Sequence, residues 1–291
     1  MLGFAVIEEG RTVFTEEAPG VFSVDSRFVE GKNGVVVGSR GAAAIDGSNF
    51  PDEGEAMADF ISSRGHPVDR LVLTHGHGDH ILGAGPLAGG EVYAHTLTPG
   101  VISAQLAGWA DRWEISRDEA GERVVCPTVT FTDELRIDLG GKHLWMFPTP
   151  GHSEDGVSVL VEEDRLLFAG DSVVTGIVPA IGNGDSRVLE RSLERLVSMD
   201  IEILVPGHGQ TLHGSNRVKD WLIWQKGYLT RVRERVQALL NDGVDGEDVP
   251  DLVDFDELIE GRLSREKHGM PKRHKNTIQK ITQEISQTQS P

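Results

Sequence analysis

The segment His75-Gly76-His77-Gly78-Asp79-His80 gathers three histidines and one aspartate within six residues. It follows the apolar run Leu71–Thr74, which predicts a buried strand, and precedes Ile81–Ala88, which predicts the start of a helix. Alternate side chains of an extended chain point the same way, so His75 and His77 can converge on one metal position. The neighbouring Asp79 and His80 diverge enough to serve a second position. Imidazole and carboxylate are ligands that zinc and similar metals prefer. The segment therefore predicts a metal site on a strand-to-helix loop.

The spacing of this segment resembles the His-x-His-x-Asp-His signature of the metallo-β-lactamase superfamily. That resemblance implies a later histidine, a later aspartate and a final histidine, each directly after its own strand. All three are present in that order: His152 follows a strand ending at Phe147, Asp171 follows one from Arg165, and His208 follows one from Ile201. The likeness covers about residues 20–212, which is most of the chain.

The resemblance implies a dinuclear site. It assigns His75, His77 and His152 to a first metal, and Asp79, His80 and His208 to a second, with Asp171 bridging the two. It implies two zinc ions, with iron or manganese as alternatives, and a metal-bridging hydroxide as the nucleophile of a hydrolase. Asp79 is then also the catalytic residue that orients this hydroxide.

The order of predicted elements indicates an α/β protein. Strands are expected at Val21–Val24, Asn33–Gly38, Ala42–Asp46, Glu91–Ala94, Val129–Phe131, Leu135–Leu139, His143–Phe147, Val157–Val161, Arg165–Ala169 and Ile201–Val205. Helices are expected at Pro51–Arg64, His95–Ser116, Asp185–Met199, Asp220–Asn241, Asp251–Leu263 and His274–Ser286.

Two similar halves predict two sheets face to face with helices outside, the four-layer αβ/βα sandwich of the metallo-β-lactamase fold. We expect this domain over residues 1–214 and a C-terminal helical extension packed on it over residues 215–291. The extension can pack on the core, form a dimer surface or frame the pocket, and its sequence does not choose among these roles.

Charge and composition exclude several classes of partner. The net charge of −18, from 28 basic and 46 acidic residues, opposes binding to a nucleic-acid backbone. A single cysteine forms no intrachain disulfide and suits a reducing compartment. Residues 1–14 do not resemble a signal peptide, and the chain has no apolar stretch long enough to span a membrane. We therefore expect a cytoplasmic enzyme for a small molecule, with a homodimer as the default assembly.

Several branches of the superfamily fit poorly. Enzymes that destroy β-lactams generally lack the aspartate at the position of Asp171 and are usually exported. Flavo-diiron members usually carry glutamate at the position of His77. The nucleases carry an inserted domain for which the segment between Asp171 and His208 has no room.

Other branches stay open. Glyoxalase II-like thioesterases keep all seven ligands and a helical tail, but their basic glutathione site cannot be placed here. Persulfide dioxygenase-like members share the motifs and use one iron for oxidative chemistry. A lactonase assignment lacks the tyrosine that usually follows the bridging aspartate. A non-catalytic subunit that keeps the site for binding is the alternative outside enzymes.

The substrate-binding residues are predicted from apolar side chains near the motifs. The loop Val173–Ile181, which includes Ile177, contains no lysine or arginine. Trp109 and Trp113 lie on a predicted helix that either faces the core or covers the site, and it can do both. An apolar pocket over metals favours a small, largely apolar ester, lactone or activated ether.

Overall fold

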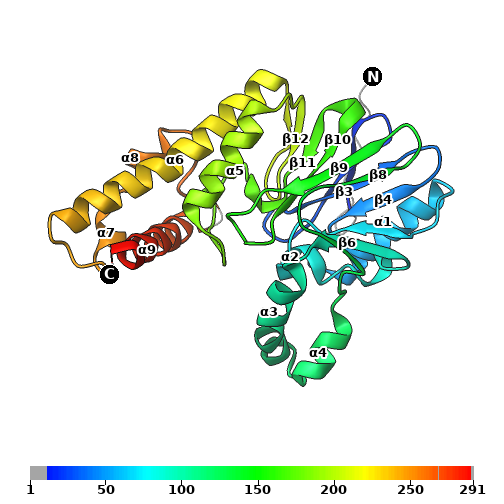
Figure 1. Ribbon diagram of the computed structural model, residues 1–291, viewed down its shortest axis with the longest axis horizontal. Helices are drawn as coiled ribbons and strands as arrows, with labels where there is room; N and C mark the ends of the chain where they lie inside the picture. The colour runs from blue at the N-terminus through cyan, green and yellow to red at the C-terminus, as the bar shows by residue number, and fades with distance from the viewer. Residues whose placement is uncertain (1–11, 268, 290–291) are drawn as a thin grey trace.

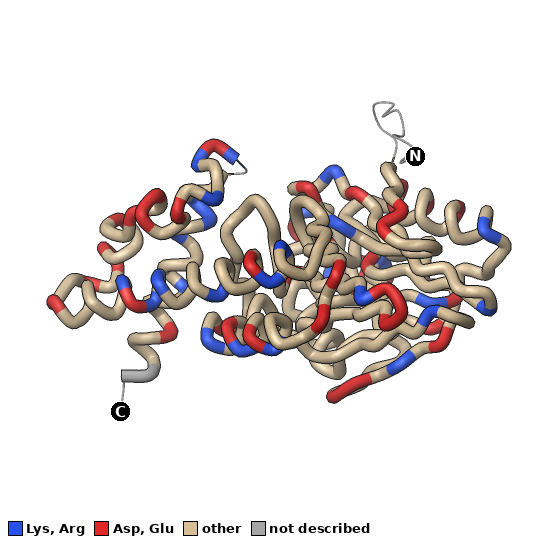
Figure 2. The backbone as a smooth tube through the Cα atoms, turned by 90° about the horizontal axis from the view of Figure 1, so that it is seen from above, with Lys and Arg blue, Asp and Glu red and all other residues tan. Residues whose placement is uncertain are grey.

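The computed structural model describes residues 12–267 and 269–289, which form two mixed β-sheets flanked by helices (Figure 1). Residues 1–11, on which part of the localisation expectation rests, lie outside this range. Within the described part of the chain, no helix combines the length and apolar character needed to cross a membrane. Figure 2 shows acidic positions spread over both the sheets and the C-terminal helices, interspersed with basic ones.

The first sheet carries the histidine-rich segment. Its seven strands lie in chain order: β1 (Phe14–Ala18), β2 (Val21–Asp25), β3 (Lys32–Val37), β4 (Ala42–Ile45), β5 (Arg70–Val72), β6 (Glu91–His95) and β7 (Val129–Phe131). The first four strands are antiparallel neighbours, whereas β4 to β7 pair in parallel. The carboxyl ends of β4 and β5 therefore meet at one edge, where the histidine-rich segment begins.

The second sheet carries the remaining ligand candidates. Its order is β13 (Leu212–His213), β12 (Ile203–Val205), β11 (Leu166–Phe168), β10 (Val157–Val161), β9 (His143–Pro148) and β8 (Leu135–Asp138). The pair β11 and β12 is parallel, so the loops after these two strands leave the same edge.

The layers follow from three apolar clusters. Residues of both sheets, such as Val36, Val72, Met146 and Val159, pack together between them. Helix α1 (Pro51–Ser63) buries Met57 and Ile61 on the outer face of the first sheet. Helices α5 (Ser186–Ser198) and α6 (Ser215–Asn241) cover the second sheet. The predicted four-layer sandwich is confirmed.

The C-terminal helices share the apolar cluster on the outer face of the second sheet. They are α6, α7 (Val249–Leu252), α8 (Phe255–Ile259) and α9 (Met270–Gln289). The single helix expected over Asp251–Leu263 is wrong. Asp254 accepts a hydrogen bond from the backbone N–H of Glu257 and so begins a new helix, α8, inside that range.

Three further differences lie in the first half of the chain. The helix expected from Ile81 is wrong: α2 (Gly78–Ile81) is a single turn that begins inside the histidine-rich segment, and a 3₁₀ turn follows at Gly85–Leu87. Strand β1 carried no sequence signal, and it forms by pairing with β2. Helices α3 (Thr98–Trp113) and α4 (Arg117–Arg123) replace the one helix expected over His95–Ser116.

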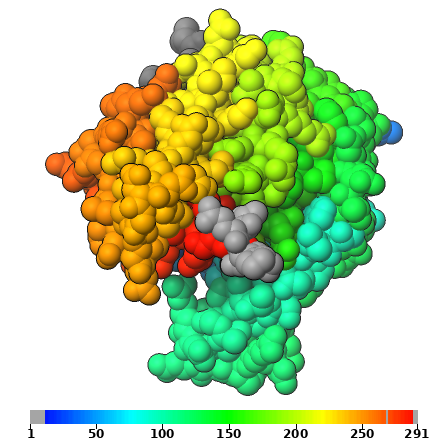
Figure 3. Space-filling model, turned by 60° about the vertical axis from the view of Figure 1, so that its left-hand side comes forward, coloured from blue at the N-terminus to red at the C-terminus, as the bar shows by residue number. Residues whose placement is uncertain are grey.

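Helices α3 and α4 form a lobe that projects from the sandwich (Figure 1). In Figure 3 this teal lobe stands apart from the orange and red C-terminal helices, and the surface is hollowed between them.

Candidate metal centre

All seven predicted ligands come together where the loops after β5, β9, β11 and β12 meet. The ligand atoms of His75, His77 and His152 lie within 4.8 Å of one another, as do those of Asp79, His80 and His208. We call these sets the first group and the second group. Asp171 joins His75 and His80 in a third such set.

The first group consists of three imidazoles. His77 Nδ1 lies 2.9 Å from His152 Nε2, as two donors to one ion would. The opposite ring nitrogens have acceptors: Thr74 Oγ1 at 3.1 Å from His75 Nδ1, Asn183 Oδ1 at 2.9 Å from His77 Nε2, and the Ala180 carbonyl at 2.8 Å from His152 Nδ1. These bonds leave His75 Nε2, His77 Nδ1 and His152 Nε2 directed at one point.

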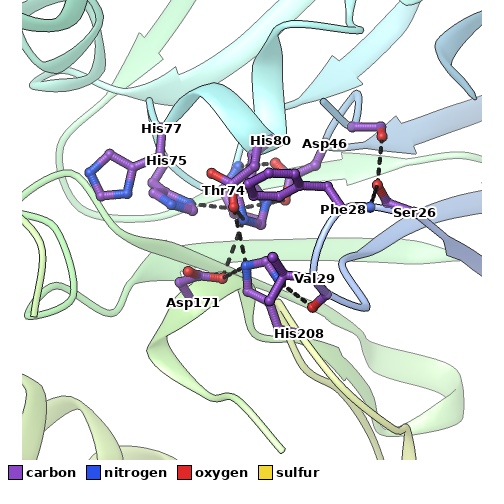
Figure 4. Close-up of polar contacts among 12 residues, drawn as sticks. Ser26, Phe28, Val29, Asp46, Thr74, His75, His77, His80, Asp171 and His208 are labelled. Atoms are coloured by element: carbon purple, nitrogen blue, oxygen red, sulfur yellow. Dashed lines mark hydrogen bonds and ion pairs between the residues drawn. The ribbon is translucent and has the colours of Figure 1, made fainter. Parts of the chain in front are cut away.

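The second group combines a carboxylate with two imidazoles. His208 Nε2 lies 3.2 Å from Asp79 Oδ2. The outer nitrogens again have acceptors: Asp46 Oδ2 lies 2.8 Å from His80 Nδ1, and the Val29 carbonyl lies 3.0 Å from His208 Nδ1 (Figure 4). The Nε2 atoms of both rings therefore face the cluster.

The Asp171 carboxylate approaches imidazoles of both groups, and Figure 4 shows it beside His208. Its Oδ2 is 3.4 Å from His152 Nε2, while its Oδ1 is 3.2 Å from His80 Nε2 and 3.4 Å from His208 Nε2. A Cβ at Gly207 would lie 2.0 Å from Asp171 Oδ1, so this close approach requires glycine there. The carboxylate can thus give one oxygen to each of two cations.

The two groups differ in protonation. Burial lowers the pKa of His75 well below its usual value and that of His152 to about 4, so both stay neutral. Burial opposes protonation of His80 and His208 as well, but carboxylates outweigh it. Asp46 and Asp171 raise the pKa of His80 well above its usual value, and Asp171 raises that of His208 to about 9. The second group is a set of ion pairs.

The donor set fits divalent metals. Among the described residues, His75 Nε2, His80 Nε2 and Asp171 Oδ1 are buried without a hydrogen-bond partner. Each imidazole has its outer nitrogen bound to a protein acceptor, which is the usual arrangement behind metal-binding histidines. Nitrogen and carboxylate donors in this ratio suit zinc, iron or manganese.

Asp46 belongs to the site although sequence reasoning did not select it. Its carboxylate accepts hydrogen bonds from the Thr74 N–H and the Thr74 hydroxyl, both at 2.7 Å, besides that of His80. Its position directly after the apolar strand β4 could have marked it as a site residue, just as Asp171 follows β11. Its φ of +57° is tolerated by aspartate better than by most residues.

Val29 carried no sequence signal. It is β-branched and yet has a φ of +51°, a strained conformation that turns its carbonyl toward His208. The neighbouring residue Phe28 is 37% exposed and lies beside the second group (Figure 4).

The predicted substrate-binding residues lie in two places. Trp109 is buried in α3 with its indole nitrogen 3.1 Å from where a Cβ at Gly78 would be, and Trp113 stacks on Trp109. Ile177 is only 2% exposed and packs in the apolar cluster of the second sheet. Contact of these three residues with substrate stays a prediction.

Lys267, from the C-terminal part of the chain, places a positive charge beside the loop Val173–Ile181, which itself contains no lysine or arginine. Its Nζ lies 3.0 Å from the position of a Cβ at Gly176, in the loop after Asp171, and 2.7 Å from Glu30 Oε2. The ion pair with Glu30 offsets its charge.

A family model described as the metallo-beta-lactamase superfamily matches residues 28–208, more than half of the chain. Among curated proteins, a linear primary-alkylsulfatase of Pseudomonas sp. (strain ATCC 19151) is 22% identical over 264 residues, which cover 78% of this chain and 49% of that protein. A hydroxyacylglutathione hydrolase of Francisella tularensis subsp. tularensis (strain WY96-3418) is 26% identical over 159 residues, 53% of this chain and 54% of that protein. The chain thus spans about half the length of these relatives.

Among solved structures, a stereoselective inverting sec-alkylsulfatase from Pseudomonas sp. superposes with a TM-score of 0.74 at 17% identity. The match covers 94% of this chain and 50% of that one. At this identity the likeness shows the fold.

Proposed function

The chain belongs to the metallo-beta-lactamase superfamily, and from that premise we propose that it is a hydrolase whose seven converging ligands hold two divalent cations. One observation carries the proposal: each imidazole turns one nitrogen to a protein acceptor and the other into the cluster. A buried polar atom without a partner costs about 1–3 kcal/mol, so the orphaned His75 Nε2 favours a bound cation.

In this proposal the first group would hold one cation, the second group would hold the other, and Asp171 could give an oxygen to each. When bound, the cations would supply Lewis acidity and bring the pKa of water in the site near neutrality. We propose zinc, because three histidine side chains form a common catalytic zinc ligand set, with iron and manganese as alternatives. Cytoplasmic location and a homodimer stay predictions.

Asp79 is the proposed catalytic residue. Its side chain is 23% exposed at the edge of the cluster, so it can face both His208 and water in the site. Burial opposes its ionisation, but His80 outweighs this and lowers the pKa of Asp79 to about 2. A carboxylate that stays ionised accepts a hydrogen bond from the nucleophilic water and orients it, and it cannot serve as a general acid near neutral pH.

The proposed substrate is an ester, lactone or activated ether with an apolar part. Half-exposed Phe28 and the uncharged loop Val173–Ile181 support this choice. The hollow between α3 and the C-terminal helices is the proposed approach, because Gln105 of α3 donates to the Gly76 carbonyl beside the ligands.

A sulfate ester of an apolar alcohol is the second candidate. Alkylsulfatases occur in both the sequence and the structure comparison. Such a substrate joins an apolar chain to an ester group that divalent cations can bind, which suits the same pocket.

Metal analysis and a substrate screen on one preparation test the proposal. We expect two zinc ions per chain and hydrolysis of aryl esters, lactones or alkyl sulfates that a chelator abolishes and zinc restores. Brisk cleavage of phosphodiesters with esters, lactones and alkyl sulfates untouched would overturn the substrate choice. Thioester cleavage alone would select the glyoxalase II-like alternative. One iron per chain with oxygen consumption would select the persulfide dioxygenase-like one.

A further inference from the structure

The segment Pro179–Ser186, which ends at the first residue of α5 and is here called the support loop, supplies the outer acceptors of two first-group imidazoles. Asn183 Oδ1 lies 2.9 Å from His77 Nε2, and the Ala180 carbonyl lies 2.8 Å from His152 Nδ1. Both bonds hold a ring on the side away from the cluster. The orientation of two of the three first-group rings thus depends on this loop.

The support loop lies directly against the ligands. The Gly182 N–H donates to the His152 carbonyl at 2.9 Å. A Cβ at Gly182 would lie 2.8 Å from His77 Cε1, so this approach requires glycine. Asn183 is the next residue, and the close contact at Gly182 brings its amide oxygen to His77 Nε2.

Helix α9 holds both ends of the support loop. At its start, the Thr277 hydroxyl donates to the Pro179 carbonyl at 2.9 Å. At its end, the Glu284 carboxylate accepts hydrogen bonds from the Ser186 N–H at 3.1 Å and from the Ser186 hydroxyl. Thr277 is only 1% exposed, so its bond has little competition from water.

The second group draws its outer acceptors from the other half of the chain. Asp46 follows β4, and Val29 lies in the loop between β2 and β3. A change in the support loop or α9 should therefore act on the first group and leave the second group in place.

We propose that Asn183 is a positioning residue for His77, and that α9, through the support loop, sets the affinity of the first metal position. The inference rests on the proposed metal centre. It deepens that proposal by giving the C-terminal helices a role in it, where the sequence left three roles open.

The chemistry follows from the tautomer of His77. Binding a cation through Nδ1 requires the ring proton on Nε2, and Asn183 Oδ1 accepts that proton. Without the acceptor the ring can rotate, and the Nδ1 lone pair is no longer aimed at the cluster. Loss of such a partner typically weakens metal binding about 10–100-fold.

The test measures the affinity of both metal positions by competition with a chromophoric chelator. In Asn183→Ala we expect one of the two binding steps to weaken about 10–100-fold and the other to stay unchanged. Asn183→Asp keeps an acceptor oxygen, so its binding should stay close to that of the parent chain. Asn216→Ala, which removes another exposed asparagine at the start of α6, is the matched control.

Thr277→Val extends the test to α9. It removes the hydroxyl that bonds Pro179 while keeping side-chain volume, and we expect the same binding step to weaken by a smaller factor. NMR of the Co²⁺-loaded protein gives a readout other than activity. The imidazole N–H signal assigned to His77 should broaden in Asn183→Ala, because its proton then exchanges faster with water.

The outcomes separate the inference from the proposed function. A parent chain that binds no divalent metal overturns the proposed function. A parent chain that binds two, with Asn183→Ala and Thr277→Val binding both as tightly as Asn216→Ala, overturns the inference and leaves the function standing. If Thr277→Val fails to fold, the exposed Asn183 variants decide the matter alone.

Discussion

The two halves of the candidate metal centre are supported by different parts of the chain. In the first group, burial lowers the pKa of His75 and His152 and keeps both neutral, and Asn183 and Ala180 of the support loop accept hydrogen bonds from His77 and His152. The second group consists of ion pairs, with Asp46 and Val29 behind its rings. Histidine side chains of one site are thus neutral in one group, at His75 and His152, and protonated in the other, at His80 and His208.

Because of this difference, we expect metal binding at the two positions to depend differently on proton release. A cation that binds the first group finds His75 and His152 already deprotonated. A cation entering the second group must displace protons from His80 and His208, so its binding is linked to pH. The predictions below test this contrast, from the largest expected effect to the smallest.

Removing Asp171, whose carboxylate approaches both groups, should have the largest effect. Asp171→Ala takes away the oxygens near His152, His80 and His208 and leaves the two second-group imidazoles without their bridging counter-charge. We expect activity to fall more than about 100-fold, because losing a ligand costs more than losing a partner behind one. Metal content and initial rates measure the effect, with Asp200→Ala at an exposed ion pair as control. A variant that kept both metals would contradict the bridging role.

Asp46→Ala should weaken the second position more than the first. It removes the acceptor of His80 directly, whereas His75 is reached only through the Thr74 hydroxyl. We expect about a 10–100-fold loss of affinity at the second position, measured by chelator competition. A loss confined to the first position would break the comparison drawn here.

The pH dependence should differ between the groups. The folded-state pKa of His208 is raised from 6.5 to about 9, so in the metal-free protein its protonated form stabilises the fold. This contribution is complete below pH 6.5 and is lost as pH rises through about 9.

Affinity at the second position should therefore increase over the same interval, about tenfold per pH unit for each proton released. The first position should change little there, because the pKa of His152 is about 4. Calorimetry in buffers of different ionisation enthalpy measures the released protons. Equal proton release at both positions would refute the contrast.

Val29→Gly should have the smallest effect. The acceptor for His208 is the backbone carbonyl, which glycine keeps, and glycine adopts a φ of +51° without strain. We expect metal affinity within about threefold of the parent and a melting temperature within a few degrees, since relief of strain and added unfolded-state entropy oppose each other. A large loss of second-position affinity would show that the valine side chain itself supports the site.

The later ligand candidates could be predicted because the histidine-rich segment resembles a superfamily signature, and that resemblance implies further ligands that each follow a strand. His152, Asp171 and His208 follow β9, β11 and β12, which run in the same direction, so the loops after these strands leave the sheet at one edge. The helix expected from Ile81 and the single helix over Asp251–Leu263 were wrong, because short apolar segments do not show where a cap or a turn interrupts them. Strand β1 was missed because its order comes from pairing with β2.

The sequence predicted the sandwich and the seven converging side chains, because strand periodicity and the position of a residue just after a strand can be read locally. Only the tertiary structure decided which nitrogen of each ring faces the cluster, that Asp46 and Asn183 stand behind the ligands, and that α9 holds the support loop. Those features join residues 34 to 106 positions apart, and the energy of such contacts depends on packing that no local pattern encodes.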